Sequence, residues 1–168
     1  MVREHMWHLS LRRSWKQISF QILISDLPPH FSGLNSLDLL KKKSTAKSKE
    51  GIRLAFAAIK TAAANSDWNF TNKLHLLEAE HQSFHQNSQS QTIVLYDASI
   101  ASAKRSGFIH EQGLACEKAG FYCKRMKNNG KALEYFNQAR ECYEGWGSSM
   151  KVCFIEKELD GLKGNNFL

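Results

Sequence analysis

Proline and long apolar runs are the two features that this 168-residue chain most clearly lacks. It has only two prolines, Pro28 and Pro29, so no later residue interrupts a helix by removing a backbone donor. No apolar run approaches the roughly 18 residues that a membrane-spanning helix needs. The sequence therefore favours a mainly helical chain beyond Pro29 and predicts no membrane span.

Motifs of nucleotide-dependent catalysis are absent as well. The chain has no GxxxxGK[ST] loop and no HRD or DFG tripeptide, the phosphate-binding and catalytic motifs of ATPases and protein kinases. It also has no CxxC pair and no recognisable secretory signal. Its four cysteines (Cys116, Cys123, Cys142 and Cys153) are therefore expected to be reduced thiols in a helical core. We expect a cytoplasmic protein; mitochondrial targeting by the basic, acid-poor start is the alternative.

The net charge of +7 is concentrated in the N-terminal part of the chain. Residues 1–68 hold 11 Lys and Arg against 5 Asp and Glu, whereas residues 69–168 hold 12 against 11. The cationic stretches 3–16 and 41–53 are compatible with contact to nucleic acid or anionic lipid. Because no recognition helix is evident in them, a solvated charged segment is the preferred interpretation.

Composition divides the chain into four parts. Residues 1–36 form a basic segment of poorly defined structure, in which ISFQILIS is compatible with a strand or a short buried helix. Residues 37–66 form a Lys-rich linker and a flanking helix. Residues 67–162 form a helical domain, and residues 163–168 form a tail. The flanking helix, between Lys49 and Asn65, has an apolar stripe of Ile52, Phe56, Ile59 and Ala63.

Apolar spacings of three and four residues predict the helices of the domain. The first covers 69–87, with Phe70, Leu74, Leu77, His81 and Phe84 on one face. The second covers 92–106, with Leu95, Tyr96, Ser99, Ile100 and Ala103 facing inward. A last helix begins after Ser148, carries Val152, Ile155 and Leu159, and is expected to fray over Gly161–Leu168.

The stretch from Phe108 to Gly147 organises the rest of the domain. Two helix-length segments flank Asn128-Asn129-Gly130, residues that tolerate the left-handed backbone at a helix end. A short loop between two amphipathic helices predicts an antiparallel hairpin.

Small and aromatic residues of this hairpin resemble the 34-residue tetratricopeptide (TPR) unit. Gly120, Ala132, Phe136 and Ala139 have its spacing, although Cys123 stands where that unit usually has Tyr and Glu144 where it has Pro. Tyr96 and Phe136 would occupy equivalent places 40 residues apart, so the repeat is irregular. The predicted fold is all-α, with TPR-like antiparallel helix hairpins forming a short right-handed α-solenoid. The residues expected to carry this structural motif are Gly107, Gly120, Ala132, Phe136, Ala139, Trp146 and Gly147.

Residues 68–160 also resemble one particular helical region. The segments LLEAE (76–80), LYDASI (95–100), GFIHEQGLACEKAGFY (107–122), ECYEGWG (141–147) and KVCFIE (151–156) occur in that order. They look like the region that follows the AAA/STAND-type ATPase module in multi-domain hybrid histidine kinases with Ser/Thr-kinase-like domains. Cys116 stands where that family commonly has Asn. The resemblance implies a C-terminal fragment, with the kinase and ATPase domains outside these residues, and a regulatory role.

Several side chains are candidates for chemistry. His81 and His85 have the spacing of a two-histidine metal face, with His75 earlier on the same helix, but Gln82 stands where a zincin requires Glu. His110 and Glu111 open a helix, where an acid is favourable on dipole grounds alone. For all of these, as for the cysteines and for the carboxylates Glu78 and Glu80, structural roles are the preferred interpretation.

We therefore expect a non-enzymatic helical scaffold with no catalytic residue, no cofactor and no metal. Its partner would be a protein or peptide, or a neighbouring domain of a larger signalling protein, bound along the helices 69–87 and 108–126. The alternatives are a basic protein associated with nucleic acid and a piece of a signalling kinase.

Overall fold

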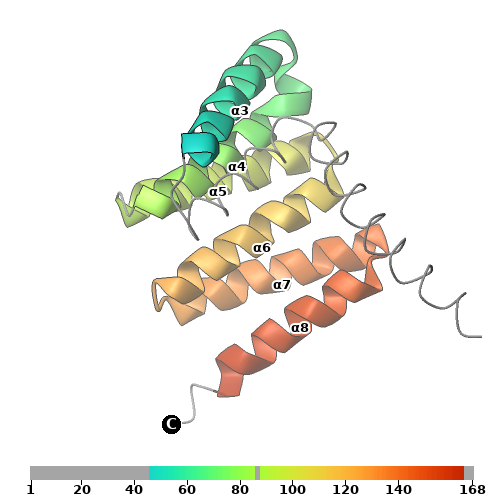
Figure 1. The fold of residues 1–168 in the computed structure, drawn as a ribbon. Coiled ribbons are helices and arrows are strands. Elements are labelled where there is room, and N and C mark those ends of the chain that lie inside the picture. The colour runs from blue at the N-terminus through green and yellow to red at the C-terminus, as the bar shows by residue number, and fades with distance from the viewer. Residues whose placement is uncertain (1–45, 86–87, 165–168) are drawn as a thin grey trace, which may run out of the picture.

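The computed structural model describes residues 46–85 and 88–164, and in these residues the chain forms six helices and no strand (Figure 1). The all-α prediction is confirmed for this part. The predictions for the basic segment 1–36 and for the start of the Lys-rich linker lie outside the described residues. The helices are α3 (Ala46–Asn65), α4 (Asp67–His85), α5 (Gln89–Arg105), α6 (Ile109–Arg125), α7 (Asn129–Trp146) and α8 (Ser149–Gly164).

Helices that follow one another in the chain lie side by side in space. Each described helix packs against the next, from α3 to α8, and α4 also contacts α6 (Figure 1). The chain reverses direction at each short connection, as the predicted hairpin of α6 and α7 requires. α6 lies in the middle of this arrangement, with contacts to α4, α5 and α7.

Three helix ends use the same backbone motif, twenty residues apart. Gly107, Lys127 and Gly147 have positive φ angles of 72°, 60° and 79°. In each case the next residue donates its N–H to a carbonyl five positions back, which satisfies the last turn of the helix. The prediction for Asn128-Asn129-Gly130 was therefore wrong in detail. Lys127 takes the left-handed conformation, whereas Asn128 caps the next helix by accepting the N–H of Lys131 at 3.2 Å.

The helices share one hydrophobic core. Its members come from all six helices, so the flanking helix α3 belongs to the same packed unit as the domain after it. The largest fully buried side chains are Ile59, Leu77, Tyr96, Phe136, Tyr143, Ile155 and Leu162. The predicted inward residues of α5 are confirmed for Tyr96, Ser99, Ile100 and Ala103.

Two helices differ from the prediction. On α4, Leu77 is buried as predicted, but the polar residues Asn72, Glu80 and Ser83 are also buried. On α8, the helix continues through Gly161 to Gly164, and Leu162 is buried, so the helix does not fray from Gly161. The core also excludes one of the four thiols, because Cys153 is exposed while the other three are buried.

Glycines set the distance between α6 and α7. A Cβ atom placed on Gly120 would lie 2.7 Å from the ring of Phe136, and one on Gly113 would lie 3.0 Å from the ring of Tyr143. Both rings are fully buried, and Phe136 is held edge-on by Phe121 at 5.1 Å between centroids. The two helices can approach this closely only because these positions have no side chain.

We predict that Lys127→Gly raises the free energy of unfolding by about 1 kcal/mol, because glycine adopts the left-handed conformation without the steric cost that lysine has. Gly147→Ala should lower it by about 1 kcal/mol for the converse reason. Urea unfolding followed by circular dichroism measures both. Destabilisation by Lys127→Gly would contradict the assigned helix end.

We also predict that Gly120→Ala lowers the free energy of unfolding by about 1–2 kcal/mol, because the buried Phe136 ring cannot yield without strain. Gly161→Ala is the matched control. Its Cβ would meet no atom within 4 Å, so higher helix propensity should stabilise α8 by up to about 1 kcal/mol. The midpoints of thermal unfolding of the two variants should shift in opposite directions. Equal shifts would contradict the close packing at Gly120.

Candidate functional site

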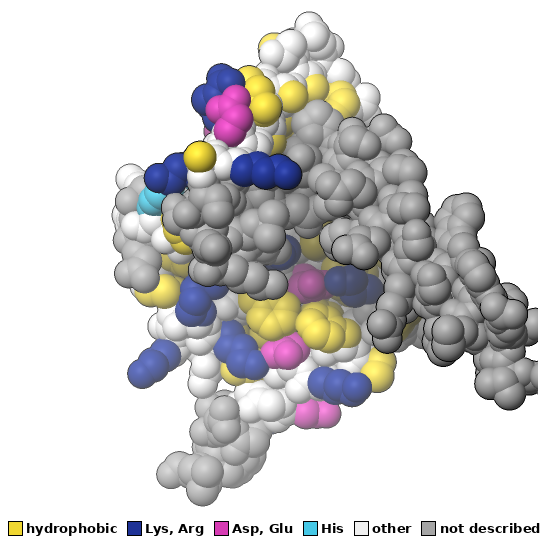
Figure 2. All heavy atoms as spheres, viewed as in Figure 1, with side chains coloured by type: hydrophobic (Ala, Val, Ile, Leu, Met, Phe, Trp, Pro, Cys, Tyr) yellow, Lys and Arg dark blue, Asp and Glu magenta, His cyan; other side chains and the backbone are white. Residues whose placement is uncertain are grey.

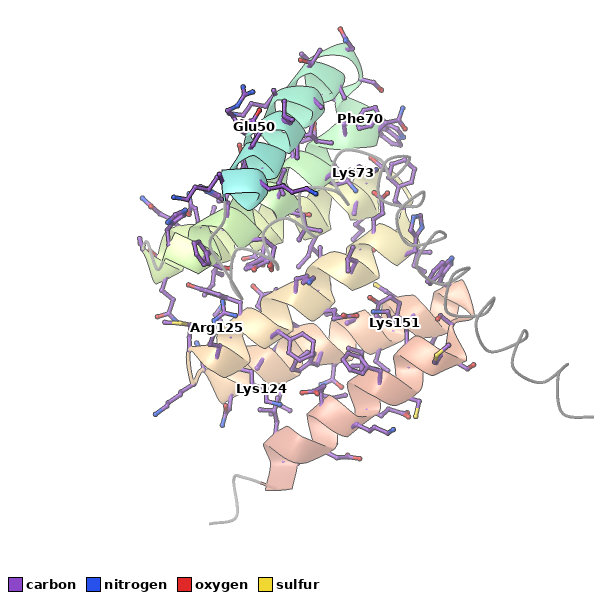
Figure 3. The ribbon with its side chains drawn as sticks, viewed as in Figure 1. Glu50, Phe70, Lys73, Lys124, Arg125 and Lys151 are labelled. Carbon is purple, nitrogen blue, oxygen red and sulfur yellow. The ribbon has the colours of Figure 1, made fainter. Side chains whose placement is uncertain are left out.

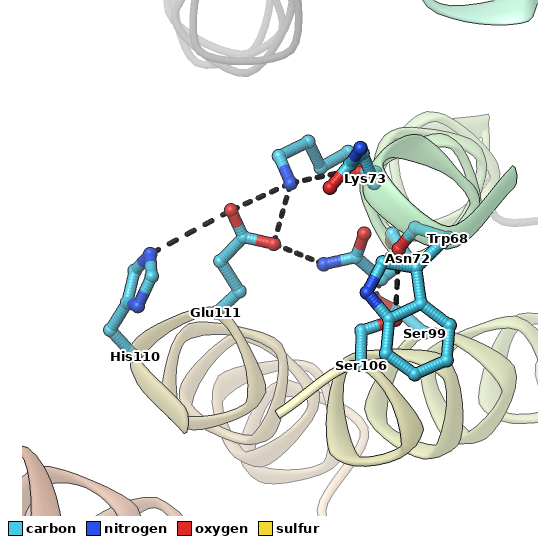
Figure 4. A network of polar contacts seen from close by, with 8 residues as sticks. Trp68, Asn72, Lys73, Ser99, Ser106, His110 and Glu111 are labelled. Atoms are coloured by element: carbon cyan, nitrogen blue, oxygen red, sulfur yellow. Dashed lines mark hydrogen bonds and ion pairs between the residues drawn. The ribbon is translucent and has the colours of Figure 1, made fainter. Parts of the chain in front are cut away.

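A polar network joins α4 to α6. Glu111 accepts hydrogen bonds from the ammonium group of Lys73, at 2.7 Å, and from the amide of Asn72 (Figure 4). Lys73 also donates to the carbonyl of Asn69 at 2.7 Å, so its ammonium group binds acceptors on both α4 and α6. The lysine lies over the rings of Phe70 and Phe108, at 5.7 and 5.0 Å from their centroids.

Two ion pairs join α6 to α8. The ammonium group of Lys151 lies 2.8 Å from the carboxylate of Glu117, and that of Lys124 lies 2.6 Å from the carboxylate of Glu158. Tyr143, on α7, donates its hydroxyl to Glu117 at 2.7 Å. Glu117 therefore receives donors from two helices, α7 and α8, which also pack against each other.

Two phenylalanines lie between these ion pairs. The rings of Phe121 on α6 and Phe154 on α8 have their centroids 6.0 Å apart. Lys151 lies 5.7 Å from the centroid of Phe154. Phe154 remains 42% exposed, whereas Phe121 also packs on the buried Phe136. Figure 3 places Lys124 and Lys151 on the same side of the molecule, with Lys73 and Arg125.

These residues form one surface, which we call the α4–α6–α8 face. It consists of Phe70, Lys73, Phe108, Glu111, Glu117, Phe121, Lys124, Arg125, Lys151, Phe154 and Glu158. Figure 2 shows this side of the molecule, where apolar side chains are surrounded by basic and acidic ones. The face contains α4 and α6, the two helices that the sequence predicted would line a groove, and adds α8.

Tyrosine–carboxylate hydrogen bonds join further pairs of helices. Tyr96 donates its hydroxyl to the buried Glu80 at 2.6 Å, and Tyr135 donates to the exposed Asp97 at 2.6 Å. Burial raises the pKa of Tyr96 well above its usual value, and the adjacent carboxylate adds to the shift. Burial, with the neighbouring carboxylate, likewise raises the pKa of Tyr135 and of Tyr143. All three hydroxyls are therefore protonated donors at neutral pH.

The histidine candidates have structural neighbours. The rings of His81 and His85 lie 4.6 Å apart, and His81 also packs edge-on against Phe56. Burial, followed by the proximity of His85, lowers the pKa of His81. Within residues 46–85 and 88–164, no group of three or more His, Cys, Asp and Glu side chains is placed to hold a metal ion.

His110 and Glu111 lie close together but differ in surroundings. The Nε2 atom of His110 is 3.7 Å from Glu111, and its ring stacks on Trp146 at 5.4 Å. Glu111 is directed toward α4, whereas His110 is exposed. Glu78 lines a hollow of about 430 Å³ between α3, α4 and α5, while its near neighbour Glu80 is buried against Tyr96.

The buried thiols also have defined neighbours. A hydrogen bond with Cys142, together with burial, raises the pKa of Cys116, and the same bond lowers the pKa of Cys142. Burial raises the pKa of Cys123 to about 11. Cys116 and Cys123 are therefore thiols rather than thiolates at neutral pH.

The structure brings most of the predicted motif residues to the contact between α6 and α7. Gly120 lies against Phe136, and Ala132, Phe136 and Ala139 are fully buried. Gly107 and Gly147 occupy left-handed positions after α5 and α7. Trp146 differs from the others because it is 52% exposed and stacks on His110.

The contribution of α8 to the face was not predicted from the sequence. Lys151, Phe154 and Glu158 recur at spacings of three and four, which places them on one side of a helix. Only the apolar stripe of Val152, Ile155 and Leu159 was considered there. The sequence signal that could have indicated this face is a polar stripe on the last helix that contains one large aromatic residue.

Comparison with known proteins gives no relative for this chain. No family model, no curated protein and no solved structure matches it. The relation to hybrid histidine kinases therefore stays a prediction. Among the described helices, none has the length and apolar content that crossing a bilayer requires.

We predict that Tyr143→Phe lowers the free energy of unfolding by about 2 kcal/mol, because the buried Glu117 carboxylate loses a donor that water cannot replace. Tyr135→Phe is the control. Its partner Asp97 is exposed and can be hydrated, so the loss should be about 0.5–1 kcal/mol. Urea unfolding of both variants gives the comparison, and equal losses would contradict a role for burial.

Proposed function

We propose that this chain is a non-enzymatic helical scaffold whose α4–α6–α8 face binds a segment of another protein or a neighbouring domain. In this proposal the helix pairs α4–α5 and α6–α7 are TPR-like hairpins of a short α-solenoid, with α3 and α8 on either side. The first helix of each pair and α8 then present a common binding surface.

The order of the helices supports the solenoid arrangement. Consecutive helices pack on one another, and α4 also contacts α6, as first helices of adjacent repeats do. The contact of Gly120 with Phe136 fits the small-residue and aromatic positions of a TPR unit. α4 and α6 begin at residues 67 and 109, so the repeat is longer than 34 residues.

The exposed aromatic pair of the face carries the functional proposal. Phe154 does not belong to the hydrophobic core, yet it lies against Phe121 and has the ammonium group of Lys151 5.7 Å from its ring centroid. Large apolar side chains that stay partly exposed beside a polar rim are typical of protein interaction sites. The ion pairs hold α6 and α8 in register around the rings, so the surface exists before a partner binds.

Nucleic acid is less favoured as the partner of this face. Affinity for a polyanion depends on basic groups that are free to neutralise phosphates. Lys73, Lys124 and Lys151 each have a carboxylate within 3 Å. These three ion pairs therefore contribute no net positive charge for a long phosphate backbone to neutralise.

We predict that a photo-cross-linking residue at position 154 captures a defined protein in cells that make this chain. The same residue at Asp160, which is exposed and points to the other side of α8, should not capture it. Gel analysis of cross-linked species, followed by mass spectrometry, gives the result. If both positions give the same cross-linked species, or if position 154 gives no cross-linked protein, the result would count against binding at this face.

A further inference from the structure

We infer that the patch formed by Phe121, Phe154, Lys124, Arg125 and Lys151 binds an acidic protein segment that carries one large apolar side chain between its carboxylates. This inference rests on the proposed function and names the chemistry of the partner. The apolar side chain would lie on the two rings, and the carboxylates would lie on the cations around them.

The rings offer a fixed apolar anchor. Phe121 is held edge-on by the buried Phe136, and Phe154 lies 6.0 Å from Phe121 between centroids. The planes of Phe121 and Phe154 are inclined by 45°, so the two rings form a bent surface rather than a flat stack. An aromatic or branched aliphatic side chain covers such a surface at low entropic cost, because the rings are already held in place.

Some N–H donors of the basic side chains near the rings have no acceptor among the described residues. An ammonium group has three N–H donors and a guanidinium has five. Lys124 uses one of its donors on Glu158, and Lys151 uses its donors on the two oxygens of Glu117. Arg125 has no hydrogen-bond acceptor among the described residues, and its guanidinium lies 5.4 Å from the centroid of the Tyr122 ring.

The carboxylates of the patch are recessed behind its cations. The side chain of Lys151 is 41% exposed and that of Glu117 is 10% exposed. For Lys124 and Glu158 the corresponding fractions are 39% and 23%. Arg125, one helical turn after Phe121, is exposed and adds an unpaired positive charge. The patch therefore presents positive charge and free donors to a partner, which complements carboxylates.

Charge argues against occupants from this chain itself. A second copy has the same net charge of +7 and would be repelled. The segment 1–36 is also basic, with four Lys and Arg against two Asp and Glu. A polyanion would meet Glu117 and Glu158 as well as the cations, whereas a short acidic segment can place its few carboxylates beside the free donors only.

The test is selection of a displayed random library of 12-residue peptides on the full-length chain. We expect the recovered peptides to carry several Asp or Glu residues around one aromatic or long aliphatic residue. Dissociation constants of the synthetic peptides are then measured by fluorescence anisotropy. Replacing the acids of a peptide by their amides should weaken binding by about tenfold or more, since each lost charge pair has a modest cost.

Variants of the chain locate the binding. Arg125→Gln should weaken binding about three- to tenfold, and it removes no ion pair of the described structure. Lys151→Gln should weaken it similarly. Lys163→Gln is the control, because this exposed lysine lies on the opposite face of α8 from Phe154. Circular dichroism establishes that each variant is folded before binding is measured.

The outcomes separate this inference from the proposed function. If the recovered peptides are neutral or basic, but their binding is lost in Phe154→Ala, the face binds protein and the inference is overturned. If no peptide depends on Phe154, both are overturned. If a labelled 20-residue oligouridine binds more tightly than any acidic peptide and is weakened by Arg125→Gln, the partner is nucleic acid and the inference is again overturned.

Discussion

The close approach of α6 and α7 is the constraint on which the rest of this structure depends. Gly113 and Gly120 leave room for the rings of Tyr143 and Phe136, so both rings are buried between the two helices. This contact brings the Tyr143 hydroxyl to Glu117 and gives Phe121 a ring to pack against. Glu117 then binds Lys151, and Phe121 lies against Phe154, so contacts with α6 add to the packing of α8 on α7.

Polar side chains link helices that share little direct packing. α4 contacts α6 over a small area, and Lys73, Asn72 and Glu111 join the two across it. The ion pairs of Glu117 and Glu158 do the same between α6 and α8. Partly buried ion pairs add modest stability but specify geometry, because each charge must meet its partner. In our account these links hold the three helices as one face, with the apolar core behind it.

The sequence predicted the helices and much of the core, but it did not predict how polar residues are paired. Spacings of three and four residues identified Ile59, Leu77, Tyr96 and Ile155 as inward-facing, because an amphipathic helix buries its apolar stripe. The buried Glu80 was not predicted, since its burial depends on Tyr96, sixteen residues away on another helix. Lys127 was not predicted as left-handed, because Gly130 and two asparagines nearby have the stronger preference for turns. Cys153 was assigned to the core from residue type alone, although it lies off the apolar stripe of α8.

The central claim is that α4, α6 and α8 form one face, built around the rings of Phe121 and Phe154. The most direct test is nuclear magnetic resonance of the full-length chain in solution. We predict nuclear Overhauser effects between the ring protons of Phe121 and Phe154, and between the Phe136 ring and the Hα protons of Gly120. If Gly120 and Phe136 show the effect but no proton of α8 approaches Phe121, the hairpin exists without the face, and the account of the binding surface is contradicted.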